Sequence, residues 1–475
     1  MPRIVIVGGG PGGYEAALVA VELGAEVTLV DRDGLGGACV LTDCVPSKAL
    51  IATSDVLTGL SVAGELGLHL PTGGGIEVDT ATVFGRVKAL ALSQSLDIAQ
   101  RLAREGVDVV QGTGRLVGAA GVRAPHRVLV QRGGFDGEGR DSAGRVELAA
   151  DVVLLATGST PRVLPGSEPD GERILTWREL YDLPALPERL VVVGSGVTGA
   201  EFASGFRALG SAVTLVSSRD RVLPGEDSDA ATVIDEVFRR RGITLLDRSR
   251  AATVARSAGG VLVTLTDGRE VHGSHALIAV GSVPQTAGLG LEEAGVDVDA
   301  GGFVQVDRVS RTSVPGIYAA GDCTGVLALA SVAAMQGRIA MWHALGEAVA
   351  PLRLGAVASN VFTDPEIATV GVSQADVESG AVAAISVRLP LATNARAKMQ
   401  GLSDGFVKLF CRKGSGTVLG GVVCAPRASE LVLPLSLAVQ NGLHADQLAY
   451  SFSVYPSLSG SLTEAARQAM QASAG

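Results

Sequence analysis

Residues 4–13 read Ile-Val-Ile-Val-Gly-Gly-Gly-Pro-Gly-Gly, so a short apolar run leads directly into a glycine-rich turn. A helical pattern follows over Tyr14–Leu23, and a second apolar run over Glu26–Val30 ends at Asp31. This order of strand, glycine turn, helix, strand and acid is typical of a dinucleotide-binding βαβ unit. The sequence therefore predicts that a nucleotide-binding fold occupies the first part of the chain.

The residues of this unit have separate predicted roles. Gly8, Gly10 and Gly13 allow a tight turn, a close approach of a pyrophosphate and a close contact between helix and strand. The first turn of the helix offers unpaired N–H groups to the phosphates. Asp31 is predicted to accept hydrogen bonds from a ribose diol. An ordinary glycine-rich turn would not require the helix and the terminal acid as well.

The same pattern recurs further along the chain. The apolar run Leu190–Val193 leads into a second GxGxxG, and an apolar strand pattern follows over Ala212–Val216. The glycines predicted to contact the second nucleotide are Gly194, Gly196 and Gly199. Two dinucleotide folds in one chain imply two nucleotide cofactors and electron transfer between them.

The second unit differs from the first at the end of its second strand. Ser217 stands where the first unit has its acid, and Arg219 and Arg221 follow. Without a carboxylate, a 2′-phosphate is not repelled, and either arginine could pair with it. This pattern favours NADPH over NADH. The alternative is that both arginines are solvated surface charges.

Two cysteines lie five positions apart, directly after the first nucleotide-binding unit. Cys39 and Cys44 in this place predict a redox-active disulfide beside a cofactor. A position at the start of a helix allows the two sulfurs to meet, and a helix N-terminus lowers a thiol pKa. The other three cysteines are isolated, and we expect them to be small buried residues: Cys323, Cys411 and Cys424.

The composition excludes several other classes of protein. A chain of 475 residues predicts about three domains. A formal net charge of -10 without a long basic run argues against nucleic-acid binding. Five cysteines do not make a secreted disulfide scaffold, and no apolar run approaches the ~18 residues of a membrane span. We expect a soluble cytoplasmic protein with no signal peptide, no integral membrane segment and no metal site.

These motifs together resemble those of the pyridine nucleotide-disulfide oxidoreductases, the family of lipoamide dehydrogenase and its quinone-reducing relatives. The resemblance covers nearly the whole chain and is greatest to the quinone-reducing branch. Beside the two glycine motifs, the matching stretches are Cys39–Lys48, Ala156–Gly158, Gly316–Asp322, Pro365–Ala368 and Asn394–Ala397.

The resemblance implies an FAD in the first nucleotide-binding domain and a nicotinamide nucleotide in the second. It places Thr157 and Gly158 in the FAD site and implies that Asp322 holds the ribityl chain. It also implies that Lys48 and Glu201 form a pair near the flavin N5, and that the C-terminal domain forms a homodimer.

The predicted fold is therefore α/β, with two Rossmann-like domains and a C-terminal α+β dimerisation domain. We expect the FAD domain at residues 1–163 and 283–347, the NAD(P) domain at 164–282 and the dimerisation domain at 348–475. A hairpin layer is predicted over Arg127–Val130 and Arg145–Leu148, with a loop over Gly133–Arg145. In the last domain the predicted elements are strands at Val361–Glu366, Gly405–Phe410 and Gly420–Cys424 and a helix at Ser429–Gln440.

The sequence departs from the disulfide-reducing members near the C-terminus. Those members carry a His–Glu dyad in a His-Pro-Thr-x-Ser-Glu context, whereas this chain has Tyr455 and Gly460 at the matching positions. A phenol with a pKa of about 10 is a poor base at neutral pH. Losing a positioned base typically costs ~10²–10⁴ in rate. Mercuric reductases add a terminal cysteine pair, which is absent here.

We therefore expect an enzyme that oxidises NAD(P)H through FAD and reduces a quinone or a similar two-electron acceptor. The expected catalytic residues are Cys39, Cys44, Lys48, Glu201 and Tyr455. The main alternative is a disulfide reductase of the dihydrolipoyl dehydrogenase type, with Tyr455 or water carrying the proton. A flavoprotein that has lost its chemistry is a further alternative, although the retained cysteines argue against it.

Overall fold

A computed structural model describes residues 1–61, 63–64, 66–68, 76–118, 124–132 and 144–474. The chain divides into two compact units. Unit 1 comprises Met1–Ala49, Phe84–Arg162 and Ser282–Leu352, and unit 2 comprises Leu50–Val83, Val163–Gly281 and Arg353–Gly475. The predicted domain bounds remain a prediction, and most of the loop predicted over Gly133–Arg145 lies outside the described residues.

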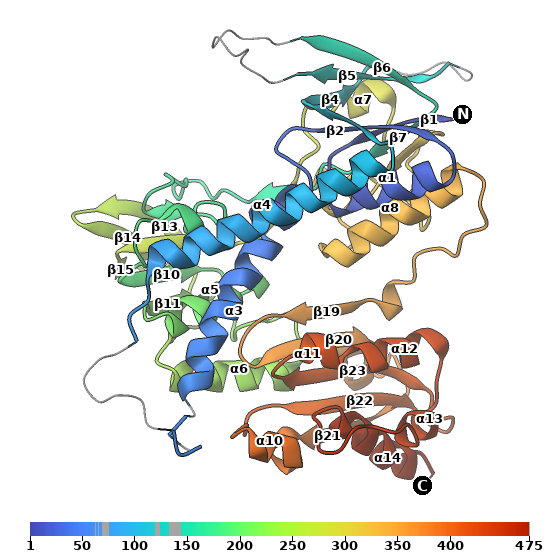
Figure 1. The fold of residues 1–475 in the computed structure, drawn as a ribbon. Helices are drawn as coiled ribbons and strands as arrows, with labels where there is room; N and C mark the ends of the chain where they lie inside the picture. The colour runs from blue at the N-terminus through green and yellow to red at the C-terminus, as the bar shows by residue number, and fades with distance from the viewer. Residues whose placement is uncertain (62, 65, 69–75, 119–123, 133–143, 475) are drawn as a thin grey trace. The chain divides into compact units, whose positions relative to one another are not determined.

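Unit 1 is built on a five-stranded parallel sheet with the order β18-β7-β1-β2-β3 (Figure 1). The apolar runs of the sequence form its centre, where Ile4 of β1 lies between Val27 of β2 and Val152 of β7. The strands are β1 (Arg3–Val7), β2 (Glu26–Asp31), β3 (Asp108–Gln111), β7 (Val152–Leu155) and β18 (Ile317–Ala319).

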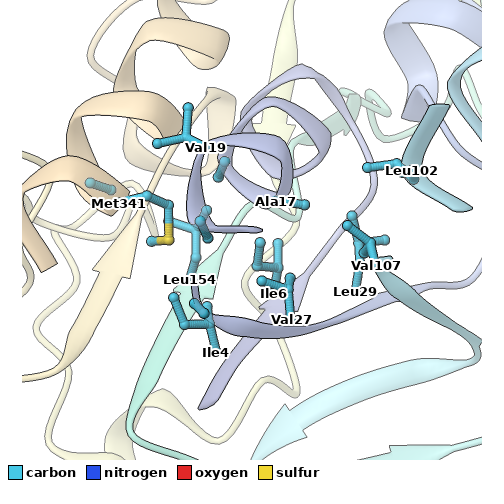
Figure 2. Packing of buried hydrophobic residues seen from close by; sticks show 14 of the residues in the cluster. Ile4, Ile6, Ala17, Val19, Val27, Leu29, Leu102, Val107, Leu154 and Met341 are labelled. Atoms are coloured by element: carbon cyan, nitrogen blue, oxygen red, sulfur yellow. The ribbon is translucent and has the colours of Figure 1, made fainter. Parts of the chain in front are cut away.

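Helices cover this sheet and close its core. Figure 2 shows Ile4, Leu29 and Leu154 of the strands packed with Val19 of α1 and Met341 of α8. Burial of such side chains is the main driving force for folding. The helices of unit 1 are α1 (Pro11–Glu22), α2 (Gly37–Leu41), α4 (Thr80–Arg104), α7 (Leu291–Ala294) and α8 (Ala330–Ala344). Helix α3 (Cys44–Ser61) begins in unit 1 and continues in unit 2.

A three-stranded antiparallel layer confirms the predicted hairpin. β5 (His126–Gln131) pairs with β6 (Arg145–Ala150), and β4 (Thr113–Leu116) adds a strand that the sequence pattern did not predict. The two segments that connect the nucleotide folds also pair with each other, as β8 (Ser159–Pro161) and β17 (Ser282–Pro284).

Unit 2 repeats the same nucleotide-binding topology. β10 lies between β11 and β16 in a parallel sheet of order β12-β11-β10-β16-β9, as β1 lies between β2 and β7. The elements are β9 (Ile174–Leu175), β10 (Arg189–Val193), α5 (Val197–Ala208), β11 (Ala212–Val216), α6 (Ser228–Arg240), β12 (Thr244–Leu246) and β16 (His275–Ile278). An antiparallel layer consists of β13 (Ala251–Ser257), β14 (Gly260–Leu265) and β15 (Glu270–Gly273).

The C-terminal part of unit 2 is an antiparallel sheet of order β19-β20-β23-β22-β21 with helices packed on it (Figure 1). The strands are β19 (Ala358–Val361), β20 (Glu366–Gly371), β21 (Ala384–Pro390), β22 (Phe406–Arg412) and β23 (Val418–Ala425). The helices are α9 (Gln374–Glu378), α10 (Ala395–Met399), α11 (Ala428–Leu431), α12 (Leu433–Asn441), α13 (Ala445–Ala449) and α14 (Gly460–Ala474). Short 3-10 helices lie at Leu180–Asp182, Asp322–Thr324, Leu354–Ala356 and Leu391–Thr393.

Two predicted elements of this part have other bounds in the structure. Of the predicted strand Val361–Glu366, only Val361, which ends β19, and Glu366, which begins β20, are strand, and residues 362–365 connect these two antiparallel strands. The predicted helix Ser429–Gln440 is two helices, because Pro434 stands at the start of α12. Proline has no N–H to donate and its ring clashes with the preceding turn, so it favours a new helix start over continuation.

Among the helices of the described residues, none has both the length and the apolar content that crossing a bilayer requires.

Candidate functional site

The first glycine turn has one open position between two closely packed ones. A Cβ at Gly8, where φ is +110°, would lie 2.2 Å from the Ala156 carbonyl oxygen, and one at Gly13 would lie 1.8 Å from the Gly8 carbonyl oxygen. A Cβ at Gly10 would meet only the Gly36 carbonyl oxygen, at 4.0 Å. Gly10 is also the N-cap of α1 and has no side chain to bond the first N–H groups. The turn therefore fits a pyrophosphate at Gly10.

The carboxylate of Asp31 organises the loop that follows the second strand. It accepts hydrogen bonds from the N–H groups of Gly9 (2.6 Å), Gly34 (2.6 Å) and Asp33 (2.9 Å). Burial is the largest influence on this carboxyl and raises its pKa, and the three N–H donors oppose that rise. A carboxylate has about four acceptor sites, so these bonds leave capacity for a ribose hydroxyl.

Asp322 lies in the same unit, at the start of a 3-10 helix after β18. Its carboxylate accepts a hydrogen bond of 2.8 Å from the hydroxyl of Ser159, and burial raises its pKa. The amide of Gln285 donates to the carbonyl oxygens of Thr157 and Ser159, both at 3.1 Å. Gly158 has a φ of +69° and open space where a Cβ would stand. These contacts fix the segment after β7 beside Asp322.

Cys39 and Cys44 are free thiols in contact with each other. The S–H of Cys44 donates a hydrogen bond to the sulfur of Cys39, and this bond lowers the pKa of Cys39. The same bond raises the pKa of Cys44, and burial raises it further. Cys44 begins α3, and a helix N-terminus was expected to lower the pKa of a thiol. The hydrogen bond to Cys39 and burial determine the pKa of Cys44 instead, and both raise it. Cys39 is therefore the thiol of the pair that ionises more readily.

Lys48 and Asp322 act on the same pair. The ammonium of Lys48 lowers the pKa of both cysteines, whereas the carboxylate of Asp322 raises that of Cys39. The structure thus brings Cys39, Cys44, Lys48 and Asp322 together in unit 1. Lys48 lies one turn after Cys44 on α3, which places both on one helix face.

A cavity of about 170 Å³ lies between α1 and α4. Apolar and charged side chains line it together, among them Tyr14, Leu18, Asp97 and Arg101. Burial raises the pKa of Tyr14, and the negative charges of Glu15 and Cys39 raise it further. Tyr14 therefore lies within electrostatic reach of the cysteine pair.

The three glycines of the second GxGxxG turn differ from one another in the same way as those of the first: two are closely packed and one faces open space. A Cβ at Gly194 would lie 2.1 Å from the Ala279 carbonyl oxygen, and one at Gly199 would lie 1.9 Å from the Gly194 carbonyl oxygen. A Cβ at Gly196 would have nothing within 4 Å. The second turn therefore offers the same open position to a dinucleotide.

Ser217 is buried and fixes the start of the loop after β11. Its hydroxyl shares a 2.8 Å hydrogen bond with the hydroxyl of Ser195 and accepts a 3.1 Å bond from the N–H of Arg219. Arg219 is exposed. Arg221 is half-buried, and its Nε has no hydrogen-bond partner among the described residues. Ser217 thus orients the backbone that carries both arginines.

Glu201 is buried in α5 of unit 2. Its carboxylate accepts a 2.8 Å hydrogen bond from the backbone N–H of Phe362. Lys48 belongs to unit 1, and the pairing of Lys48 with Glu201 stays a prediction.

The side chain of Tyr455 is 85% exposed, and several neighbouring side chains are exposed as well. Tyr450, Phe452 and Val454 present apolar side chains to solvent on the same segment, which ends before α14. A run of this kind is typical of a surface that a partner covers. Within the described residues, no group of three His, Cys, Asp or Glu side chains is arranged to hold a metal ion.

Comparison with known proteins decides the family. Residues 2–337 match the family described as pyridine nucleotide-disulphide oxidoreductase, and residues 357–466 match its dimerisation domain. The chain belongs to the pyridine nucleotide-disulphide oxidoreductase family. This family implies a flavin and a nicotinamide nucleotide, and the two glycine turns fit two such dinucleotides.

Three relatives cover almost the whole chain. A protein of Mycobacterium tuberculosis named NAD(P)H dehydrogenase (quinone) is 56% identical over 98% of this chain and 94% of its own length. A dihydrolipoyl dehydrogenase of Chlorobaculum tepidum is 35% identical over 98% of this chain and 97% of its own length. The crystal structure of LpdA from M. tuberculosis superimposes with a TM-score of 0.93 at 56% identity, over 98% of this chain and 99% of that one. The fold and the family predicted from the motifs are confirmed.

Several residues of the site were not found by sequence reasoning. Ser159 and Gln285 lie outside every motif, and their contacts depend on the pairing of β8 with β17. Lys408 had a visible signal, since it interrupts the apolar run Phe406–Cys411 of β22. A charged residue in such a run is buried only when it is paired.

The open position at Gly10 predicts a variant that folds but binds FAD weakly. In Gly10→Ala, the Cβ would occupy the space left for the pyrophosphate without touching the protein. We expect its affinity for FAD to fall about tenfold or more while the melting temperature of the FAD-free protein stays unchanged. FAD titration followed by fluorescence, together with thermal unfolding, measures both.

Two variants serve as comparisons. Gly13→Ala forces its Cβ against backbone and should lower the melting temperature itself. Gly59→Ala meets nothing within 4 Å, so it should leave the affinity for FAD unchanged and, because alanine favours a helix over glycine, should not lower the melting temperature. Normal FAD affinity in Gly10→Ala would contradict the assignment of the pyrophosphate to this turn.

The hydrogen bond between the two thiols predicts how Cys39 reacts with an alkylating agent. Because Cys44 holds the pKa of Cys39 below its ordinary value, Cys39 should react with iodoacetamide at a lower pH than a free cysteine. In Cys44→Ala that donor is lost while burial, Asp43 and Asp322 still raise the pKa, so the midpoint of the pH profile should move upward. Mass spectrometry of the alkylated peptides follows the rate.

The buried cysteines provide the internal comparison for this experiment. Burial raises the pKa of Cys323 to about 11 and those of Cys411 and Cys424 to about 12, so they should stay unmodified. An unchanged profile for Cys39 in Cys44→Ala would show that the hydrogen bond does not set its pKa.

Proposed function

We propose that the chain is an FAD-dependent oxidoreductase that oxidises NAD(P)H and reduces a quinone or a similar two-electron acceptor. The observation that carries the proposal is an intact pair of nucleotide sites together with a thiol pair that lacks the C-terminal base. The name of the 56% identical relative of M. tuberculosis supports the same activity.

The residues of unit 1 suit the binding of FAD. In this proposal the turn at Gly10 would bind the pyrophosphate, Asp31 would accept from a ribose hydroxyl, and Asp322 would accept from the ribityl chain; the open position at Gly10 and the contacts of both carboxylates support it. Bound FAD supplies two-electron chemistry between a nicotinamide nucleotide and an acceptor.

The two kinds of acceptor place different demands on the side chains that hold protons near the cysteine pair. Cys44 keeps its proton and hydrogen-bonds the sulfur of Cys39, and Lys48 adds a positive charge nearby. A quinone takes its protons from water, so it needs no positioned base from the protein. A disulfide substrate needs such a base, and the exposed phenol of Tyr455 is a weak one. Glu201 is proposed to hold Lys48 in place.

The cavity between α1 and α4 offers room for a small acceptor. Tyr14 lines this cavity and lies within electrostatic reach of Cys39. The guanidinium of Arg101 is available there as a donor to a carbonyl oxygen of the acceptor.

We infer that the enzyme is a homodimer formed through the domain at 348–475. The match of residues 357–466 to a dimerisation domain supports this inference. The exposed apolar segment with Tyr450, Phe452 and Tyr455 belongs to the same domain.

A disulfide reductase of the dihydrolipoyl dehydrogenase type is the second candidate. Both cysteines are present and in contact, and the pKa of Cys39 is lowered as an attacking thiol requires. The dihydrolipoyl dehydrogenase of C. tepidum, at 35% identity, supports this candidate less strongly than the quinone-reducing relative supports the first.

Steady-state turnover separates the two candidates. With NADPH as donor, we expect menadione to be reduced at least ~10²-fold faster than lipoamide or glutathione disulfide, because no histidine stands at position 455 to deprotonate the attacking thiol and protonate the leaving one. Cys39→Ser should keep the menadione activity. Fast disulfide reduction that disappears in Cys39→Ser would instead establish the second candidate.

We propose NADPH as the preferred donor. The second nucleotide fold has no acid after β11, and the exposed Arg219 is available to pair with a 2′-phosphate. In Arg219→Ala, kcat/KM for NADPH should fall about tenfold while the value for NADH stays unchanged. Equal losses for both nucleotides, or none, would show that Arg219 does not recognise the 2′-phosphate.

A further inference from the structure

Lys408 is a buried cation in the middle of β22. Its Nζ lies 2.8 Å from both carboxylate oxygens of Asp227 and 2.7 Å from Oδ2 of Asp229, and it also donates to the side-chain oxygen of Gln374. The side chains of Lys408 and Asp227 are both 2% exposed. The ring of Phe406 lies 5.3 Å from Nζ. All the donors of this ammonium are therefore used inside unit 2.

These contacts connect the antiparallel sheet with the nucleotide-binding fold. Asp227 is the N-cap of α6, and its Oδ1 accepts from the N–H groups of Asp229 and Ala230. The same carboxylate receives Lys408 from β22. Lys408 thus fixes the point at which α6 begins.

The same point is the end of the loop over residues 217–227. Ser217 begins this loop, and Arg219 and Arg221 stand on it. The N–H of Leu223 donates to the carbonyl oxygen of Ser195 at 2.8 Å, which attaches the loop to the second glycine turn. The loop therefore runs from the nucleotide-binding turn to the carboxylate that Lys408 holds.

The loop has a conformation that needs anchors. Leu223 has a φ of +52° and is almost fully buried, an uncommon backbone state for a side chain of its size. Such a state is strained and persists only where the surroundings enforce it. The N–H of Val222 bonds Asp235 at 3.1 Å on one side of Leu223, and Lys408 fixes Asp227 on the other.

The positive charge of Lys408 also stabilises the buried carboxylate of Asp227. Without the ammonium, Asp227 would be a buried carboxylate held only by N–H groups, and Asp229 would lie beside it. An unpaired buried charge is strongly destabilising, so the start of α6 would move to hydrate it. Any such movement displaces the end of the loop that carries Arg219 and Arg221.

We propose that Lys408 is a positioning residue for the nicotinamide nucleotide. From the antiparallel sheet it holds Asp227, and through Asp227 it keeps the loop 217–227 in the conformation that receives the adenosine end of the nucleotide. The proposal rests on the proposed function only in that the second glycine turn binds a nicotinamide nucleotide, and it is independent of the acceptor.

Binding of NADP⁺ to the FAD-loaded protein tests the proposal. In Lys408→Met, which keeps the length of the side chain, we expect the Kd measured by calorimetry to rise on the order of tenfold. FAD content and the turnover at saturating NADPH should stay within about twofold of the original protein, because the flavin site and the transfer step are not touched. KM for NADPH should rise with the Kd.

Three further variants make the result specific. Lys408→Arg keeps the charge and should bind NADP⁺ nearly as the original protein does. Lys413→Met removes an exposed lysine just beyond β22 and should have no effect. Asp227→Asn keeps a side-chain cap for α6 but loses the charge that pairs with Lys408, so it should also raise the Kd for NADP⁺. This variant tests the proposal if Lys408→Met does not fold.

An unchanged Kd in Lys408→Met, or in Asp227→Asn where Lys408→Met does not fold, overturns the proposal. So does a fall in turnover at saturating NADPH without a change in Kd. Absence of menadione reduction with normal NADP⁺ binding overturns the proposed acceptor and leaves the role of Lys408 standing. Absence of NADP⁺ and NAD⁺ binding to the original protein overturns both.

Discussion

The contact between the third glycine of each GxGxxG motif and the carbonyl of the first is the constraint on which both nucleotide folds depend. A Cβ would come within 1.8 Å of that oxygen at Gly13 and within 1.9 Å at Gly199. Only glycine lets the helix begin so close to its strand, and this closeness leaves the second glycine facing open space. The same geometry occurs twice, so each unit of the chain has a place for one dinucleotide.

Local patterns predicted those parts of the fold whose contacts are local. The apolar runs at Ile4–Val7 and Leu190–Val193 became strands because both sheets bury them on both faces. The predicted strand Val361–Glu366 failed in its middle: Val361 ends β19 and Glu366 begins β20, but the chain reverses over residues 362–365. The pattern of apolar residues alone does not separate the end of one strand from the connection to the next, because only the partner strand defines where pairing stops.

The candidate site was predictable to the extent that it lies in motifs. Cys39, Cys44, Lys48 and Asp322 all lie in stretches that match the family's motifs, and the structure brings them together in unit 1. The direction in which the two thiols differ was not predictable, because it depends on which sulfur donates to the other. Ser159 and Lys408 were missed for a similar reason: their partners are 163 and 181 residues away in sequence. Such contacts follow from tertiary packing: the charge of Lys408 within the apolar run of β22 indicated that it is paired, but not with which residue.

The thiol pair explains how the cysteines can matter without a C-terminal base. Cys44 retains its proton in the hydrogen bond to Cys39, while Lys48 favours negative charge on either sulfur. Ionisation of Cys39 is therefore favoured by groups of unit 1 alone, without help from Tyr455. Opening a disulfide substrate requires more, because a leaving thiolate must be protonated at a fixed position in each turnover. A quinone makes no such demand, so the arrangement of charges in unit 1 suits an acceptor that obtains its protons from water.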